Sequence, residues 1–362
     1  MVKEWNTSLV YWTGVAALIP QAYLTFMSFP SIRVKGTDST NSSKRRTSSL
    51  HWDYFIATGA VYMFSLLAAQ IKTYFVHGLH HATLTPLPAG LIQIKIPTKA
   101  SWKPGQHVFL RIFGVGIHSF TAHPFTVSSL PEDSNQGKEN EMVFYIKPRR
   151  GVTARLAKEA EELPGRVKAV MLEGPYGGLD TSLDRFDTIL VITGGSGAGF
   201  SLAIIKEILR MNNVGEKKRK LQMIFSTRVP SAAEWYQNSL DTILSTSPGS
   251  NNMDISKSIH ITSGSTRRSL EISDPTDLEK TEVPNTSTEI TSDFSRPDIP
   301  SIVTGVISSS TTTPAKQQRI GIFTCGPTSM IHDTRAATAR AQRDVLSGRV
   351  GEIYLHDECF SW

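Results

Sequence analysis

The chain has 362 residues, which at about 150 residues per domain leaves room for about two domains and an appendage. With 40% hydrophobic and 19% charged residues it can bury real cores, so a wholly disordered protein is excluded. The net charge of +6 suits an anionic nucleotide or a lipid face, and it is too small to indicate nucleic acid as a partner.

Cysteine usage favours a reducing compartment. Cys325 and Cys359 are the only cysteines, which excludes a disulfide framework and a cysteine-based metal site. We therefore expect the folded part of the chain to face the cytosol, and we predict no metal site in it.

Two apolar stretches near the N-terminus, residues 9–29 and 54–72, are candidate membrane-spanning helices. Each approaches the roughly 20 residues that a helix needs to cross hydrocarbon, so residues 1–75 are predicted to be a transmembrane region in a lipid bilayer. The alternative is a buried or interfacial helix, because Pro20 interrupts the first stretch and Gly59 dilutes the second.

Residues 80–180 are predicted to form an antiparallel β-barrel or sandwich. Short apolar runs are separated there by turns rich in Pro and Gly. The expected strands are 91–97, 107–113, 124–130, 142–147 and 167–174.

Residues 186–362 are predicted to form an α/β domain with a parallel sheet, because apolar runs alternate there with helical stretches. The expected strands are 187–195, 220–228 and 319–327, and the expected helices are 200–212, 232–244 and 328–344. An insertion at about 245–317 is dominated by Ser, Thr, Pro and Asn. Apart from a short candidate strand at 258–262, it is predicted to be disordered because it has too little apolar surface to bury.

A glycine-rich turn at residues 194–199 joins the first of these strands to its helix, and it contains Gly194, Gly195, Gly197 and Gly199. Glycines let the backbone approach a pyrophosphate, and the helix N-terminus offers unpaired N–H groups. The turn therefore predicts nucleotide binding, with a plain tight turn as the alternative. The lack of a Walker lysine after it disfavours a P-loop.

The next strand ends at Ser226, Thr227 and Arg228. An arginine at this edge of a Rossmann-like sheet favours the 2′-phosphate of NADPH, whereas a carboxylate would favour NADH. The alternative is an ordinary exposed arginine.

Three further motifs have ordinary explanations when taken singly. HPFT at 123–126 fits a histidine at the start of a strand, CGP at 325–327 fits a helix cap, and residues 358–362 fit a frayed tail. Their order along the chain is more specific. Together with their neighbours they give HPFTVSS (123–129), KPRRGVTARL (147–156), LEGPYGG (172–178), GGSGAGFSLAI (194–204), TCGP (324–327) and ECFSW (358–362).

In these motifs the chain resembles the fungal ferric/cupric metalloreductases, membrane flavocytochromes related to NADPH oxidases and, in the soluble half, to ferredoxin–NADP reductase. The resemblance covers residues 83–244 and 319–362 well, and both apolar stretches more loosely. It implies a membrane-helix remnant followed by a ferredoxin–NADP reductase-like module, with an FAD-binding β-barrel and a Rossmann-like NADPH domain.

The resemblance also implies which residues contact FAD. They are His123, Pro124, Phe125, Thr126, Gly151 and Thr153. Thr126 would lie near the flavin ring and His123 toward the ribityl-phosphate side, since a flavin needs a flat apolar neighbour and a small hydroxyl. Gly151 and Thr153 would place backbone N–H groups and a cap hydroxyl on the pyrophosphate.

A second set of residues would bind NADPH by the same resemblance. They are Gly194, Gly195, Gly197, Gly199, Arg228, Cys325, Gly326 and Pro327. The glycines would hold the pyrophosphate, Arg228 the 2′-phosphate, and Cys325 would border the nicotinamide. Phe360 is similar to the terminal aromatic that covers the flavin until nicotinamide displaces it. Thr126, Cys325 and Phe360 are thus the residues expected nearest to the chemistry.

The activity implied is hydride transfer from NADPH to FAD, followed by transfer of single electrons to a ferric or cupric acceptor. The module would be cytosolic on a membrane protein, with the plasma membrane as the expected location. One alternative is a superoxide-generating NADPH oxidase, which is disfavoured because Ser361 and Trp362 extend beyond Phe360 as in the fungal reductases. Another is a non-catalytic remnant of a metalloreductase.

The haem ligands of the family are not found here. Its members hold haem through paired histidines on membrane helices, whereas His51, His77, His80 and His81 have the wrong spacing. The loop at 32–53 is basic, so two spans would put the dehydrogenase on the side that lacks NADPH. Both arguments favour a truncated relative whose dehydrogenase part is intact.

Overall fold

The computed structural model describes residues 56–68, 71, 78–88, 90–132, 139–212, 219–262, 296–311 and 318–359. The chain divides into two units, Met1–Leu79 and His80–Trp362. The predictions for residues 9–29, for Phe360 and for the middle of the insertion at 263–295 lie outside the described residues.

In the first unit the structure describes a helix at residues 56–68, inside the apolar stretch 54–72. Its apolar side chains include Ile56, which is 66% exposed, and Phe64, which is 70% exposed. Among the described residues, no helix combines the length and the apolar character needed to cross a membrane.

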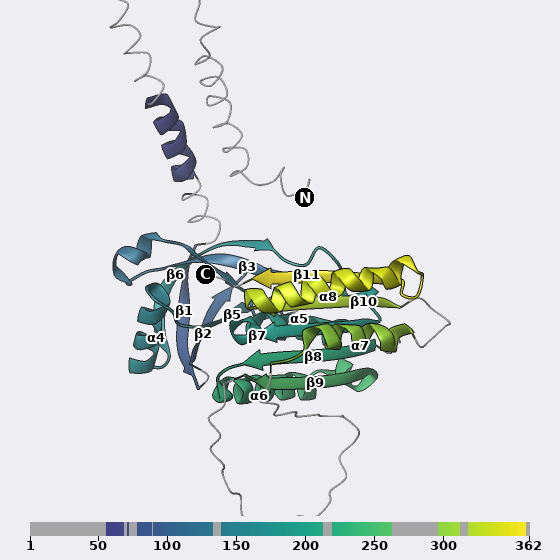
Figure 1. Cartoon of the computed structure of the whole chain (residues 1–362). Helices are drawn as coiled ribbons and strands as arrows, with labels where there is room; N and C mark the ends of the chain where they lie inside the picture. Colours follow the sequence, from purple (N-terminus) through teal and green to yellow (C-terminus); the bar gives the residue numbers. More distant parts are fainter. Residues whose placement is uncertain are drawn as a thin grey trace, which may run out of the picture. The chain divides into compact units, whose positions relative to one another are not determined.

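The second unit begins with an antiparallel sheet that closes into a barrel (Figure 1). Its strands are β1 (Leu79–Leu87), β2 (Leu91–Thr98), β3 (Gln106–Ile112), β4 (His123–Thr126), β5 (Asn140–Ile146) and β6 (Arg166–Gly177), in the order β4-β3-β6-β1-β2-β5. Just beyond β4, the backbone N–H of Ser128 donates to the Val143 carbonyl of β5 at 2.8 Å, which joins the two edges. Alternate residues of β2, namely Ile92, Ile94 and Ile96, fill the barrel core.

The rest of the unit is a parallel sheet covered by helices on both faces (Figure 1). Its strands are β7 (Thr188–Gly194), β8 (Arg219–Thr227), β9 (Met253–Ile261), β10 (Arg319–Gly326) and β11 (Glu352–Cys359), in the order β11-β10-β7-β8-β9. Ile189 and Val191 face the core shared with α5 (Ala198–Asn212) and α6 (Pro230–Thr246). Leu190 and Ile192 face the core shared with α7 (Ile299–Thr311) and α8 (Thr328–Leu346). The continuous apolar run of β7 therefore reflects burial on both faces.

The prediction of disorder over residues 245–317 is wrong for part of that range, because it contains α7 and also β9, which begins before the candidate strand at 258–262 and overlaps it. β9 pairs with β8 over its whole length and needs few apolar side chains as an edge strand. α7 places Ile299, Val303 and Val306 at helical spacing and buries all three in the core beside α8. A few apolar residues at the right spacing thus order an otherwise polar sequence.

Candidate active site

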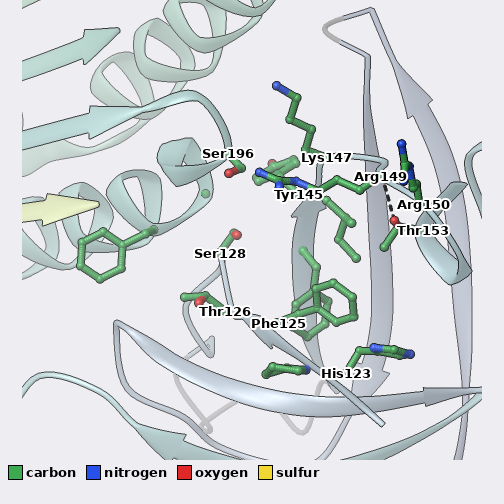
Figure 2. Close-up of a pocket in the computed structure, with 15 residues that line it drawn as sticks. His123, Phe125, Thr126, Ser128, Tyr145, Lys147, Arg149, Arg150, Thr153 and Ser196 are labelled. Carbon is green, nitrogen blue, oxygen red and sulfur yellow. Dashed lines mark hydrogen bonds between the residues drawn. The ribbon is translucent and has the colours of Figure 1, made fainter. Parts of the chain in front are cut away.

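A cavity of about 660 Å³ lies between the barrel and the glycine-rich turn after β7, within the ~300–1,000 Å³ typical of small-molecule sites. Figure 2 shows side chains from both domains around it. Six of the residues predicted from the sequence line the cavity, namely His123, Pro124, Phe125, Thr126, Thr153 and Gly199. The structure therefore brings the β4 motif, the start of α4 (Val152–Glu162) and the glycine-rich turn to one place.

One end of the cavity is basic. Lys147, Arg149 and Arg150 line it, and no acidic side chain of the described residues pairs with them. The backbone N–H of Arg149 donates to Thr153 Oγ1 at 2.9 Å, and Gly151 precedes the helix with a φ of +76°, which a glycine adopts without strain. Unpaired cations beside a helix N-terminus attract phosphate groups, so these residues fit a dinucleotide pyrophosphate.

At the other side of the cavity, the surroundings of His123 favour the neutral form of its imidazole. Burial, and secondly the neighbouring His118, lower the pKa of the His123 imidazole. Its Nε2 lies 2.9 Å from Thr121 Oγ1, and the Thr121 hydroxyl donates to the His118 carbonyl at 2.8 Å. Since that hydroxyl hydrogen is used, His123 must donate from Nε2, which leaves Nδ1 as an acceptor.

The glycine-rich turn lies where the strand order of the parallel sheet reverses, between β7 and β10, which is where such sheets bind ligands. A Cβ at Gly197 would overlap the Cys325 carbonyl oxygen, and one at Gly199 would overlap Ser128 Oγ in the barrel. A Cβ at Gly194 would lie only 2.9 Å from Pro327 Cδ. Gly195 has open space around it and a φ of +56°. Each of the four predicted glycines is thus favoured at its position, either by close packing or by its backbone conformation.

Cys325 does not line this cavity. It is fully buried at the end of β10, beneath Gly197, and burial raises the pKa of its thiol. Gly326 and Pro327 pack beside Gly194, where a Cβ on Gly326 would meet Met330 Sδ at 2.8 Å. Contact of these three residues with a nicotinamide stays a prediction.

Arg228 also lies away from the cavity. It is exposed and directly follows β8, at the edge of the sheet where β7 ends in the glycine-rich turn. Its place between β8 and α6 is the one expected for a residue near the adenosine ribose. A role in binding a 2′-phosphate stays a prediction.

Some lining residues were not predicted as site residues. They are Ser128, Phe144, Tyr145, Ile146, Lys147, Arg149, Arg150, Ser196 and Phe200. Several stand inside the quoted motifs, and for the basic residues the run KPRR was a usable signal. Tyr145 had no such signal, because its position depends on contacts between the two domains.

Comparison with known families agrees with this division of the second unit. Residues 76–179 match the model of an FAD-binding domain, and residues 186–339 match that of the ferric reductase NAD binding domain. The chain therefore has an FAD-binding domain followed by an NAD-binding domain of the ferric reductase type. The predicted fold, a β-barrel FAD domain with an α/β NAD(P) domain, is confirmed, and FAD and a nicotinamide dinucleotide are its cofactors.

Individual relatives of this chain are distant. It is 28% identical over 263 residues to "Probable cell surface ferric reductase kap2" of Aspergillus oryzae, covering 64% of this chain and 34% of that protein. It is 24% identical over 307 residues to "Ferric reductase transmembrane component 5" of Saccharomyces cerevisiae, covering 80% of this chain and 40% of that protein. The chain therefore spans well under half the length of these relatives.

Solved structures similar to this chain include a ferredoxin NADP+ reductase from Neisseria gonorrhoeae with bound FAD and NADP. The sequence identity is 17%, the TM-score is 0.47, and the match covers 77% of this chain and 98% of that one.

Proposed function

We propose that this chain is an NADPH-dependent, FAD-containing reductase that passes single electrons to a ferric or cupric acceptor. The observation that carries the proposal is the cavity in which the basic start of α4 and the β4 motif face the glycine-rich turn of the other domain. A flavin bound by the first set of residues would lie beside a nicotinamide held by the second, as hydride transfer requires.

In the proposed mechanism the chain contributes mainly geometry. When bound, FAD would supply the redox chemistry by accepting a hydride and releasing single electrons. Arg149 and Arg150 would neutralise its pyrophosphate, and the Thr126 hydroxyl would form a hydrogen bond near the flavin ring. Phe125 would exclude water from one side of the cavity. Phe360 is proposed to cover the flavin in the absence of a nicotinamide.

On the dinucleotide side, the backbone N–H groups of the glycine-rich turn would bind the NADPH pyrophosphate. Arg228 would bind the 2′-phosphate, and Cys325, Gly326 and Pro327 would border the nicotinamide. We propose that buried Cys325 acts through the turn that it supports, since Gly197 packs directly on it.

The proposed location is a membrane, which we expect to be the plasma membrane. The FAD and NADPH domains would lie on its cytosolic side. The exposed apolar side chains of the helix at 56–68 support attachment to a lipid bilayer. Flotation of the full chain with lipid vesicles tests this, because a chain that stays in the aqueous fractions has no such attachment.

A second candidate is an NADPH oxidase, because the chain is also 23% identical over 188 residues to "Dual oxidase 2" of Sus scrofa. The two candidates separate when the purified chain is saturated with FAD and given NADPH with either a ferric chelate or oxygen. The proposed function predicts reduction of the chelate without superoxide. Superoxide formation would favour the oxidase, and flavin uptake without any NADPH oxidation would favour a non-catalytic remnant.

A further inference from the structure

Trp235 connects the dinucleotide-binding domain to the wall of the cavity. It lies on α6, and its indole meets the Tyr145 ring of β5 edge to face, with ring centroids 4.9 Å apart and an interplanar angle of 68°. Ala232 on the same helix packs with Leu91 of β2, and Trp235 packs against this pair. α6 therefore meets the barrel at two places.

Tyr145 is the cavity-lining partner of this contact. Its hydroxyl oxygen accepts a hydrogen bond from Gln93 Nε2 at 3.4 Å, and burial raises the pKa of the phenol. On another side its Cδ2 atom would lie 3.3 Å from a Cβ placed at Gly199 in the glycine-rich turn. The ring is thus enclosed by Gln93, Trp235 and the start of α5, and the cavity is its open side.

The helix that carries Trp235 is anchored to the dinucleotide side. α6 begins at Pro230, two residues after Arg228. The next residue, Tyr236, is fully buried, and its hydroxyl lies 2.8 Å from Ser201 Oγ, which donates to the Ala198 carbonyl in the first turn of α5. A shift of the β8–α6 turn would therefore be transmitted to Trp235 along one rigid helix.

We propose that Trp235 is a positioning residue that holds the Tyr145 ring in the cavity wall and so couples occupancy of the dinucleotide site to the flavin site. The inference rests on the proposed function, because it takes FAD as the occupant of the cavity. An edge-to-face aromatic pair contributes to stability beyond its buried area, so losing the indole should loosen the Tyr145 ring.

The test compares Trp235→Leu with Trp235→Phe and with Ile243→Ala, measuring the Kd for FAD, and kcat and KM for NADPH at saturating FAD. Ile243 is a matched control because it is buried in the core under the same helix, more than two helical turns beyond Trp235. We expect Trp235→Leu to weaken FAD binding and to lower kcat by about three- to tenfold each, with most of both restored in Trp235→Phe.

A merely structural role would give a different pattern. Trp235→Leu would then lower the melting temperature as Ile243→Ala does, while the Kd for FAD and the kcat at saturating FAD stayed at the parental values, and this result would overturn the inference. Coupling adds a second readout. NADP+ should change the FAD affinity of the parent chain and of Ile243→Ala, and it should change the FAD affinity of Trp235→Leu much less. If the parent chain takes up no FAD, the proposed function fails together with this inference. If the parent chain takes up FAD but Trp235→Leu changes neither the Kd for FAD nor kcat, only the inference about Trp235 is refuted.

Discussion

The contact between Gly199 and Ser128 offers the sharpest test of how the two domains meet. A Cβ added at Gly199 would overlap Ser128 Oγ and would lie 3.2 Å from Ser128 Cβ and 3.3 Å from Tyr145 Cδ2. Ser128 cannot easily move away, because it is 5% exposed and its backbone N–H is bonded to the Val143 carbonyl. Gly199→Ala should therefore force the start of α5 away from the barrel.

The expected loss follows from this geometry. Overpacking a well-packed site costs about 1–3 kcal/mol, and the overlap here is with an atom of a buried side chain, so we expect a loss near about 2 kcal/mol in the free energy of unfolding. Ser128→Ala removes the overlapping oxygen, and the double variant Gly199→Ala/Ser128→Ala should recover about half of the loss or more. Both residues line the cavity, so FAD affinity should fall and recover in the same order.

The assay is urea denaturation of the FAD-loaded chain for both single variants and the double variant. Gly305→Ala is the control, because Gly305 lies within α7 with no atom within 4 Å of an added Cβ. That change should stabilise the chain by about 0.5–1 kcal/mol. Strict additivity of Gly199→Ala and Ser128→Ala would refute the packing of α5 on the barrel described here.

Three further outcomes are expected. Arg228→Ala should lower kcat/KM for NADPH by about tenfold or more while leaving that for NADH nearly unchanged, because the proposed charge-assisted contact with the 2′-phosphate would be lost. Steady-state kinetics with both dinucleotides measures this. The pKa of His123 is below its ordinary 6.5 in the folded chain, so the unfolded chain takes up a proton at a higher pH than the folded chain does. The free energy of unfolding should therefore decline as the pH falls below 6.5, and it should decline less in His123→Asn. Denaturation measured across about pH 5–8 tests this. Burial raises the pKa of Tyr236 from 10.0 to about 12, so stability should be lost as the pH rises above 10; Tyr236→Phe should show a smaller loss there, at a cost of about 1 kcal/mol at neutral pH. For either residue, the same dependence of stability on pH in the parent and in the variant would contradict the pKa shift assigned to that residue.

Much of the fold could be predicted because the strongest patterns are local. The run at 187–195 and the glycines after it gave β7 and its turn, and the alternation of 91–97 gave β2. β1 and β11 were not among the expected strands. His80, His81 and Thr83 interrupt the apolar pattern of β1, and β11 lies near the end of the chain, where we expected a frayed tail. α7 and the first half of β9 were missed, because composition averages over a few well-placed apolar residues, whereas the candidate strand at 258–262 overlaps the second half of β9.

The candidate site shows the same limit. His123 and Thr126 could be chosen from a motif, and the structure places them on one cavity wall. Tyr145 and Trp235 could not be chosen, because they are 90 positions apart in the chain and only the packing of two domains brings them together. Cys325 shows the opposite case, since a motif pointed to it but its side chain is buried under Gly197.

The central claim is that this cavity holds a flavin within reach of a bound nicotinamide. Mixing the FAD-loaded chain anaerobically with one equivalent of NADPH, with no acceptor present, tests it in a single turnover. The account predicts that the visible flavin bands bleach as one NADPH is oxidised per FAD. Bound flavin that stays oxidised while NADPH persists would contradict it.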